Sequence, residues 1–254
     1  MQKALSLAAL VAALLTGSTL LAQAPAGGAQ AGAPPTPAPM TNLQFFPKDT
    51  PRAQVLQQMQ GFTQALGVQC SHCHVREDTD GRNDMAADEK ATKRTARQML
   101  MLVRDLNTRI PVAVGKSAET ATRIECMTCH RGVAIPKQLG DIMTEAVAAS
   151  GMPAAVAKYR ELRTRYYGAM PYDFSEGGLI TFANRMAMAK PDEALQWLEL
   201  NLEFNPKSAR SHLAMAQIYN RKSDKASATR SVEQALALDP QNAQAKTLLE
   251  NLKK

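Results

Sequence analysis

The sequence of 254 residues has little aromatic content, since Phe, Trp and Tyr together make up 5% of it. It has only four cysteines and four histidines, and the apolar run near its start is too short and interrupted for a membrane-spanning helix. A chain poor in aromatic residues and rich in alanine packs through helices rather than through a sheet sandwich. We therefore expect an all-α fold.

No part of the chain concentrates charge of one sign. The net charge of +7 is spread over the whole sequence, and no stretch places basic residues between aromatic ones. Proteins that bind nucleic acid usually carry such a stretch, because it neutralises phosphates and stacks on bases. The composition therefore predicts no nucleic-acid partner.

Residues 1–24 have the layout of a secretory signal peptide. Lys3 gives a positive start, residues 4–15 are apolar, and small residues follow at positions 21–24. Cleavage is favoured over an uncleaved membrane anchor, because the apolar run is short. We expect export to the periplasm, with the Ala/Pro-rich residues 25–41 as a linker.

The first helix of the ordered part is expected just after that linker. Asp49-Thr50-Pro51 is a helix-start signal, and apolar residues at helical spacing continue to Leu66. Gly67 is expected to end this helix, because glycine adopts the left-handed conformation of a helix C-terminus without a steric penalty.

A second helix is expected over residues 86–106. Its charged residues, which include Asp88, Lys93 and Arg97, are expected on the solvent-exposed surface. Residues 107–119 contain a proline and a glycine, and they are predicted to be a connector.

Two identical spacings of cysteine and histidine dominate this part of the chain: Cys70-Ser71-His72-Cys73-His74 and Cys126-Met127-Thr128-Cys129-His130. In Cys-x-x-Cys-His the two thiols add to the vinyl groups of haem and the histidine ligates the iron. On a helical turn these three side chains share one side, so they can grip a rigid ring. The motifs predict two covalently bound haem c groups in a dihaem cytochrome c domain over residues 42–140.

A zinc site and a pair of disulfides are the rival interpretations of the four cysteines. Zinc ribbons also use two Cys-x-x-Cys pairs, but usually with a shorter gap than the one from Cys73 to Cys126. Neither rival requires a histidine directly after each second cysteine. His72 fills a variable position of its motif and His212 lies far along the chain, so neither is expected to be a ligand.

The second axial ligand of each haem iron must come from outside the motif, and methionine is the available residue type. Met59 lies eleven residues before Cys70, so a helix and turn would return its sulfur to the first haem, with Met85 as the fallback. Met99 and Met101 precede the second motif, and both remain candidates there. Methionine on a helix face is core filler in most proteins, so only the adjacent haem motifs raise these candidates.

Residues 42–136 resemble the cytochrome subunit of bacterial photosynthetic reaction centres. The likeness rests on the Met59 helix that runs into the first motif, on Thr95-Ala96-Arg97-Gln98-Met99-Leu100, and on the second motif with Arg131-Gly132. In that family the methionine of Arg-x-Met-Leu ligates a haem, which implies Met99 rather than Met101 as ligand, and Met59 takes the same place in the preceding unit. The family has four haems, whereas two motifs here imply a two-haem relative.

The part of the chain after residue 140 has a different character. Asn205-Pro206 and Asp239-Pro240 stand 34 residues apart, which is the period of tetratricopeptide repeats. We expect connecting helices over residues 141–174 and repeats with a capping helix over residues 175–254. A generic helical bundle is the alternative. Small or aromatic residues take the tight-packing positions of the repeat: Ala194, Ala216, Tyr219, Ala228 and Ala235.

The function expected from these features is electron transfer without catalysis. With a histidine and a methionine on each iron, no open position is left for a substrate. The expected partner is a redox protein or a membrane electron-transport complex, and the repeats are expected to bind a protein segment. The alternatives are a dihaem peroxidase-like or reductase-like enzyme with one open haem, and a haem-containing sensor or scaffold.

Overall fold

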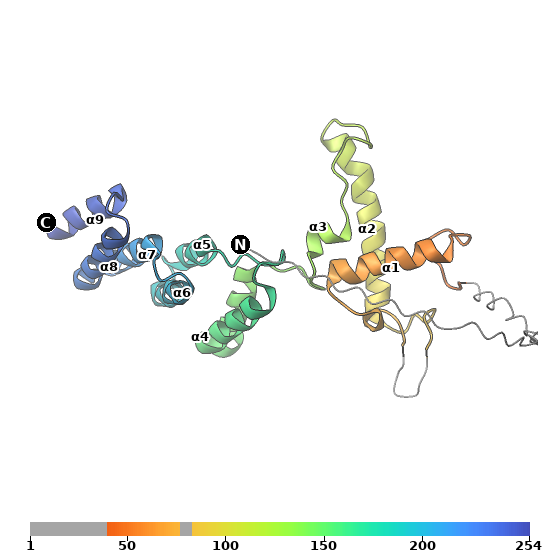
Figure 1. Ribbon diagram of the computed structural model, residues 1–254, viewed down its shortest axis with the longest axis horizontal. Helices are drawn as coiled ribbons and strands as arrows, with labels where there is room; N and C mark the ends of the chain where they lie inside the picture. Colours follow the sequence, from red (N-terminus) through yellow and green to blue (C-terminus); the bar gives the residue numbers. More distant parts are fainter. Residues whose placement is uncertain (1–39, 77–82) are drawn as a thin grey trace, which may run out of the picture. The chain divides into compact units, whose positions relative to one another are not determined.

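The computed structural model describes residues 40–76 and 83–254, so the predicted signal peptide and most of the predicted linker lie outside the described residues. The all-α prediction is confirmed, and the described residues contain helices and no strand (Figure 1). One isolated antiparallel bridge joins Val75 to Asp84. The fold is therefore built from helices and the turns that connect them.

Helix α1 spans Arg52–Leu66 and follows Pro51, as predicted. It ends at Gly67, which adopts φ 63° and ψ 35° in the left-handed region. The N–H of Gly67 donates to the carbonyl of Gln64, and the N–H of Val68 donates to that of Thr63. These bonds satisfy carbonyls that the end of a helix would otherwise leave without partners. The chain then turns directly into the first cysteine motif.

Helix α2 spans Ala91–Ala113, so both ends differ from the expected 86–106. It begins later because the Asp84 carboxylate accepts hydrogen bonds from the N–H groups of Ala86 and Ala87, each at 2.9 Å, which hold this segment as a loop. It ends later than expected, and its last turn contains Pro111, which lacks the N–H for one helical hydrogen bond. The connector prediction is therefore wrong for residues 107–113.

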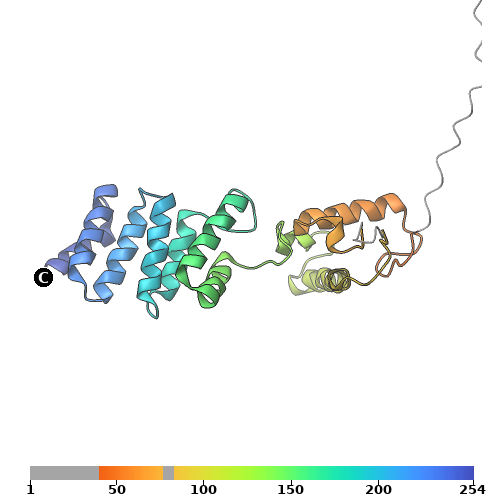
Figure 2. The same ribbon diagram turned by 90° about the horizontal axis from the view of Figure 1, so that it is seen from below.

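Five of the remaining helices form two helix pairs and a final single helix (Figure 2). The pairs are α5 (Glu176–Met186) with α6 (Pro191–Phe204) and α7 (Ala209–Arg221) with α8 (Lys225–Leu238), and α9 is Ala243–Lys253. The starts of α6 and α8 are 34 residues apart, as are those of α7 and α9. The sequence period of 34 is thus also the period of the helices.

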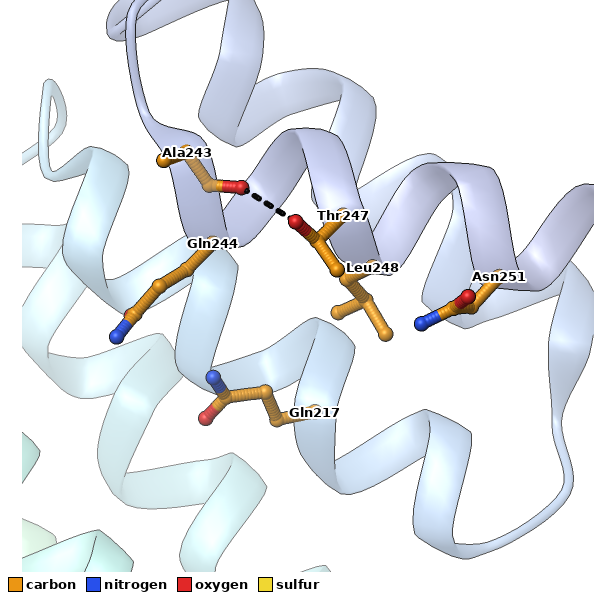
Figure 3. Close-up of a pocket in the computed structure, with 6 residues that line it drawn as sticks. All are labelled: Gln217, Ala243, Gln244, Thr247, Leu248 and Asn251. Carbon is orange, nitrogen blue, oxygen red and sulfur yellow. Dashed lines mark hydrogen bonds between the residues drawn. The ribbon is translucent and has the colours of Figure 1, made fainter.

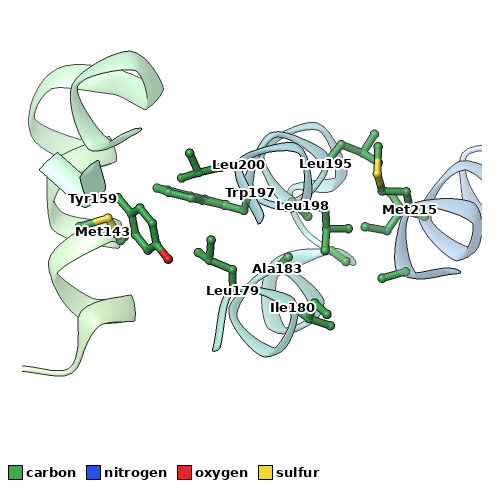
Figure 4. Close-up of a cluster of buried hydrophobic side chains, with 14 of the residues drawn as sticks. Met143, Tyr159, Leu179, Ile180, Ala183, Leu195, Trp197, Leu198, Leu200 and Met215 are labelled. Atoms are coloured by element: carbon green, nitrogen blue, oxygen red, sulfur yellow. The ribbon is translucent and has the colours of Figure 1, made fainter. Parts of the chain in front are cut away.

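Helix α4, Leu139–Tyr166, precedes these pairs and bends at Gly151, where φ is 78°. Its second half carries Tyr159, which is 1% exposed and packs edge-on against Phe174. In Figure 4, Tyr159 and Met143 of α4 face Trp197 of α6. The core therefore joins α4 to the helix pairs.

Hydrophobic burial differs sharply between the described parts of the chain. Both hydrophobic core clusters lie within residues 139–254. In the described residues before 139, only four apolar side chains are buried: Val55, Ala65, Val75 and Val133. Apolar side chains of α2 stay accessible instead, with Met99 38% and Leu102 50% exposed. This part therefore keeps apolar surface that its own core does not cover.

A bilayer-spanning helix needs a long and strongly apolar stretch. Within residues 40–76 and 83–254, no helix meets both requirements.

Candidate functional site

The first motif forms a single tight turn immediately after α1. Residues Cys70–His72 form a short 3₁₀ helix, η1, and Cys73 continues in helical conformation. The N–H of His74 donates to the carbonyl of Cys70 at 3.0 Å, which is the four-residue spacing of an α-helical bond. The two thiols and the imidazole are therefore held on one turn of backbone.

The second motif forms the five-residue helix α3, Cys126–His130. A reciprocal capping box begins it: the Glu125 carboxylate accepts from the N–H of Thr128, and the Thr128 hydroxyl accepts from the N–H of Glu125 at 3.0 Å. Arg131 ends the helix in the left-handed conformation, with φ 52°. The cap and the turn thus fix a helix that is too short to be stable by itself.

Both motif histidines are oriented by a backbone carbonyl. The Nδ1 atom of His74 lies 2.8 Å from the carbonyl oxygen of Met85, and that of His130 lies 3.0 Å from the carbonyl oxygen of Val133. A histidine that donates from Nδ1 presents Nε2 as its free lone pair, which is how metal-ligating histidines are usually held. Each imidazole is therefore prepared to ligate through Nε2.

The four thiols are all free, and no disulfide joins them. Burial is the largest cause that raises the pKa of the Cys73 thiol and of the Cys126 thiol. The described residues also contain no group of three or more His, Cys, Asp or Glu side chains placed to hold a metal ion. The arrangement fits two separate haem-attachment turns, each with a thiol pair and an imidazole that presents Nε2.

The start of α2 is fastened to the turn of the first motif. The ammonium of Lys90 donates to the carbonyl of Ser71, and the hydroxyl of Thr92 donates to the carbonyl of His72 at 2.5 Å. Both acceptors belong to residues between the two cysteines. The polar residues at the start of this helix therefore brace the turn that carries the thiols.

Lys93 corrects the expectation of a fully exposed charged surface on α2. Its side chain is buried, with 8% of the residue exposed, and its ammonium donates to the carbonyls of Met85, Ala86 and Ala87 at 2.8–3.0 Å. The Asp88 carboxylate lies 3.2 Å away. The loop carbonyls that bind the ammonium come together only when the chain folds. The periodicity of the sequence therefore wrongly predicts an exposed position for Lys93.

Asp88 links this cluster to the rest of the helix. Its carboxylate pairs with Arg97 at 2.8 Å and accepts a hydrogen bond from the Asn42 amide at 2.9 Å. Arg97, then Asn42 and Lys93, hold the pKa of Asp88 well below its usual range. The carboxylate therefore stays ionised at neutral pH and carries the charge that faces the two cations.

The same cations act on His74. Burial is the largest cause that lowers the pKa of His74, and the charges of Lys93, Arg97 and Lys90 add to it. The hydrogen bond to the Met85 carbonyl opposes this shift. The balance favours the neutral imidazole, which is the form that ligates a metal.

The two motifs meet through glycines, a contact that sequence periodicity gave no sign of. The N–H of Gly132, two residues after His130, donates to the carbonyl of Ala65 near the end of α1 at 2.8 Å. A Cβ placed on Gly67 would lie 2.1 Å from the carbonyl oxygen of Gly132. The entry to the first motif and the exit from the second are therefore in direct backbone contact.

The candidate methionines lie on two different helices. Met59 is half-buried in the middle of α1, and Met99 lies on α2. The fallback residues Met85 and Met101 are 43% and 40% exposed, close to the 38% of Met99. Exposure alone therefore does not choose between Met99 and Met101, and both assignments of a distal ligand stay predictions.

A second candidate site is a shallow pocket of about 460 Å³ on the helix pairs (Figure 3). Gln217 of α7 faces the side chains of α9 across it, among them Gln244 and Asn251. The lining is mainly amide and apolar, so it suits uncharged backbone and side-chain groups. His212 is partly buried on α7 and is not among the lining residues of this pocket.

The sequence that contains these two turns is similar to those of known cytochromes. The family model described as photosynthetic reaction centre cytochrome C subunit matches residues 18–188, about two thirds of the chain. Cytochrome c-554 of Chloroflexus aurantiacus is 38% identical over 79 residues, which is 31% of this chain. The match covers only 17% of that relative's length. The chain therefore belongs to the photosynthetic reaction centre cytochrome c subunit family, which makes it a c-type cytochrome with covalently bound haem c.

Proposed function

We propose that the chain is a dihaem electron carrier in which Cys70 and Cys73 attach one haem and Cys126 and Cys129 attach the other. The observation that carries this proposal is the duplicated turn. Each turn presents two free thiols together with a histidine whose Nδ1 is already bonded to a backbone carbonyl. His74 and His130 would then ligate the two irons through Nε2. Bound haem supplies a one-electron couple that no side chain of the protein offers.

Met59 and Met99 are proposed as the ligands on the opposite faces. Their thioether sulfurs would favour ferrous iron and raise the reduction potential. Two occupied axial positions leave no place for a substrate, which supports a carrier rather than an enzyme. The accessible apolar side chains of α2, Met99 and Leu102 among them, offer surface against which a flat apolar ring would pack.

The backbone contact between the segments that flank the two motifs supports electron exchange inside the protein. The end of α1 leads into the first motif and also contacts the turn after the second motif through the bond from Gly132 to Ala65. The chain therefore positions both attachment turns around one backbone contact. We propose residues 42–140 as the cytochrome domain that contains this contact.

The helices after residue 140 are proposed to dock a partner. Their 34-residue spacing and the fully buried alanines Ala194, Ala216 and Ala228 are typical of tetratricopeptide repeats. We propose residues 141–174 as connecting helices and residues 175–254 as the repeat array. Its pocket between α7 and α9 would bind a protein segment, and a redox protein or a membrane electron-transport complex would be the partner. Export to the periplasm through residues 1–24 is part of the same proposal.

Optical spectroscopy of the haem-loaded protein tests the proposal. Two low-spin haems, with the charge-transfer band of methionine bound to ferric iron, are the expected result. The oxidised protein should also bind cyanide and peroxide slowly, because both axial positions are filled. A high-spin fraction of one haem that binds either ligand rapidly would contradict the carrier and favour a peroxidase-like or reductase-like enzyme.

A further inference from the structure

Lys93 is the one buried charged side chain among the described residues. An ammonium group loses its hydration when it is buried, so it must receive that stabilisation from protein oxygens. Three carbonyls, at 3.0, 2.9 and 2.8 Å, and the Asp88 carboxylate surround the Nζ atom of Lys93. A positive charge is thus fixed at the base of the first motif by the loop that precedes α2.

One of those three carbonyls also orients the proximal histidine. The carbonyl oxygen of Met85 lies 2.8 Å from Nδ1 of His74 and 3.0 Å from Nζ of Lys93. A carbonyl oxygen that is polarised by an ammonium accepts a weaker hydrogen bond from an imidazole. The imidazole then donates less electron density through Nε2, and hydrogen bonds of this kind tune the potential of a bound metal.

The net charge of this cluster would also act directly on a bound haem, and this effect too would raise the reduction potential. The Asp88 carboxylate is shared by two cations, since it pairs with both Lys93 and Arg97. These three groups together carry one net positive charge close to His74. Positive charge near a haem favours the ferrous state, because reduction adds an electron.

In the described residues, the second motif has no such cation beside the carbonyl that orients its histidine. The Nδ1 of His130 bonds to the carbonyl of Val133 at 3.0 Å, and no cationic side chain of the described residues donates to that oxygen. Besides their different helix types and caps, the two turns therefore differ in the buried cation on the carbonyl that holds the first histidine.

We propose that Lys93 is a positioning residue that raises the reduction potential at the first motif above that at the second. An electron shared between the two sites would then reside mainly at Cys70–His74 rather than at Cys126–His130. The inference rests on the proposed function, since it requires a haem on each motif. It goes further by giving the pair of haems an internal direction.

The test is a spectroelectrochemical titration of the haem-loaded protein and its variants. Lys93→Met removes the charge and keeps the length of the side chain, whereas Lys93→Arg keeps the charge. We expect Lys93→Met to lower one midpoint so that its reduction equilibrium constant falls at least tenfold, which is 59 mV for one electron. Lys116→Met, which removes an exposed charge beyond the end of α2, is the matched control and should move neither midpoint to this extent.

The affected haem is identified in a background with Cys126→Ala and Cys129→Ala, which keeps only the first motif. Equal shifts of both midpoints in Lys93→Met, or no shift, would overturn the inference. If Lys93→Met does not fold, Asp88→Asn provides the decision, because loss of the counter-charge should raise the first midpoint and an unchanged value would refute the role of this cluster.

Haem content separates this inference from the function on which it rests. A pyridine haemochrome assay that finds fewer than two haems in the unmodified protein contradicts the proposed function. Two retained haems with unmoved midpoints in Lys93→Met contradict only the role of Lys93.

Discussion

Replacing Gly67 with alanine tests the backbone contact between the two motifs. Gly67 adopts φ 63°, a conformation that costs an alanine about 1–2 kcal/mol. The new Cβ would also lie 2.1 Å from the carbonyl oxygen of Gly132, and neither backbone can move aside as a flexible side chain would. Separation of the two segments would break the 2.8 Å hydrogen bond from Gly132 to Ala65, at a further cost of about 1 kcal/mol. We expect Gly67→Ala to lower the free energy of unfolding by about 2–3 kcal/mol in total.

Two other glycines of this part of the chain separate the contributions. Gly115 also has a positive φ, 65°, but a Cβ there meets nothing within 4 Å, so Gly115→Ala should cost only the conformational part. Gly61 lies inside α1 with free space around it, so Gly61→Ala should stabilise the helix by up to about 1 kcal/mol.

Guanidinium unfolding of the haem-loaded proteins, followed by circular dichroism in the Soret region, measures all three variants. This signal reports the haem environment rather than the helix pairs after residue 140. A Gly67→Ala protein as stable as Gly115→Ala would refute the contact, because it would mean that the extra methyl group at position 67 meets no backbone.

Two further predictions concern the proposed ligands and the charge cluster. Met59→Ala and Met99→Ala should each lower one haem midpoint and open that iron to cyanide, because a thioether ligand favours ferrous iron. Met101→Ala should do neither. A potentiometric titration in which Met101→Ala, and not Met99→Ala, lowers a midpoint would contradict the assignment. Arg97, Asn42 and Lys93 hold the pKa of Asp88 low, so its contribution to stability is present above the ordinary carboxyl pKa of about 4 and is lost as the pH falls further. Asp88→Asn should therefore destabilise the protein at pH 7 and flatten the decline of stability below pH 4, with Asp105→Asn as control. If thermal unfolding shows that Asp88→Asn loses as much stability below pH 4 as the unmodified protein, this role of Asp88 is excluded.

The chemistry of the site is predictable from the sequence where it depends on local spacing. The end of α1 at Gly67 and the turns at Cys70–His74 and Cys126–His130 follow from neighbouring residues, because glycine and short spacings act within one turn of backbone. The 34-residue period likewise predicts the spacing of the later helices, since each pair repeats the same packing.

Long-range polar contacts are not predictable in this way. Lys93 has the sequence surroundings of an exposed lysine, and it is buried because the loop carbonyls of residues 85–87 converge on its ammonium. The meeting of Gly67 with Gly132 joins segments that are 65 residues apart, and no periodicity relates them. The predicted start of α2 is wrong for the same reason. The Asp84 carboxylate holds the preceding loop through backbone N–H groups.

The central claim is that each cysteine motif attaches one haem, and intact mass spectrometry of the mature protein tests it most directly. The protein produced together with a c-type haem attachment system should gain the mass of two haems. The pair Cys70→Ala and Cys73→Ala should gain one haem, as should the pair Cys126→Ala and Cys129→Ala. A single haem in the unmodified protein, or two haems in either double variant, would contradict the account.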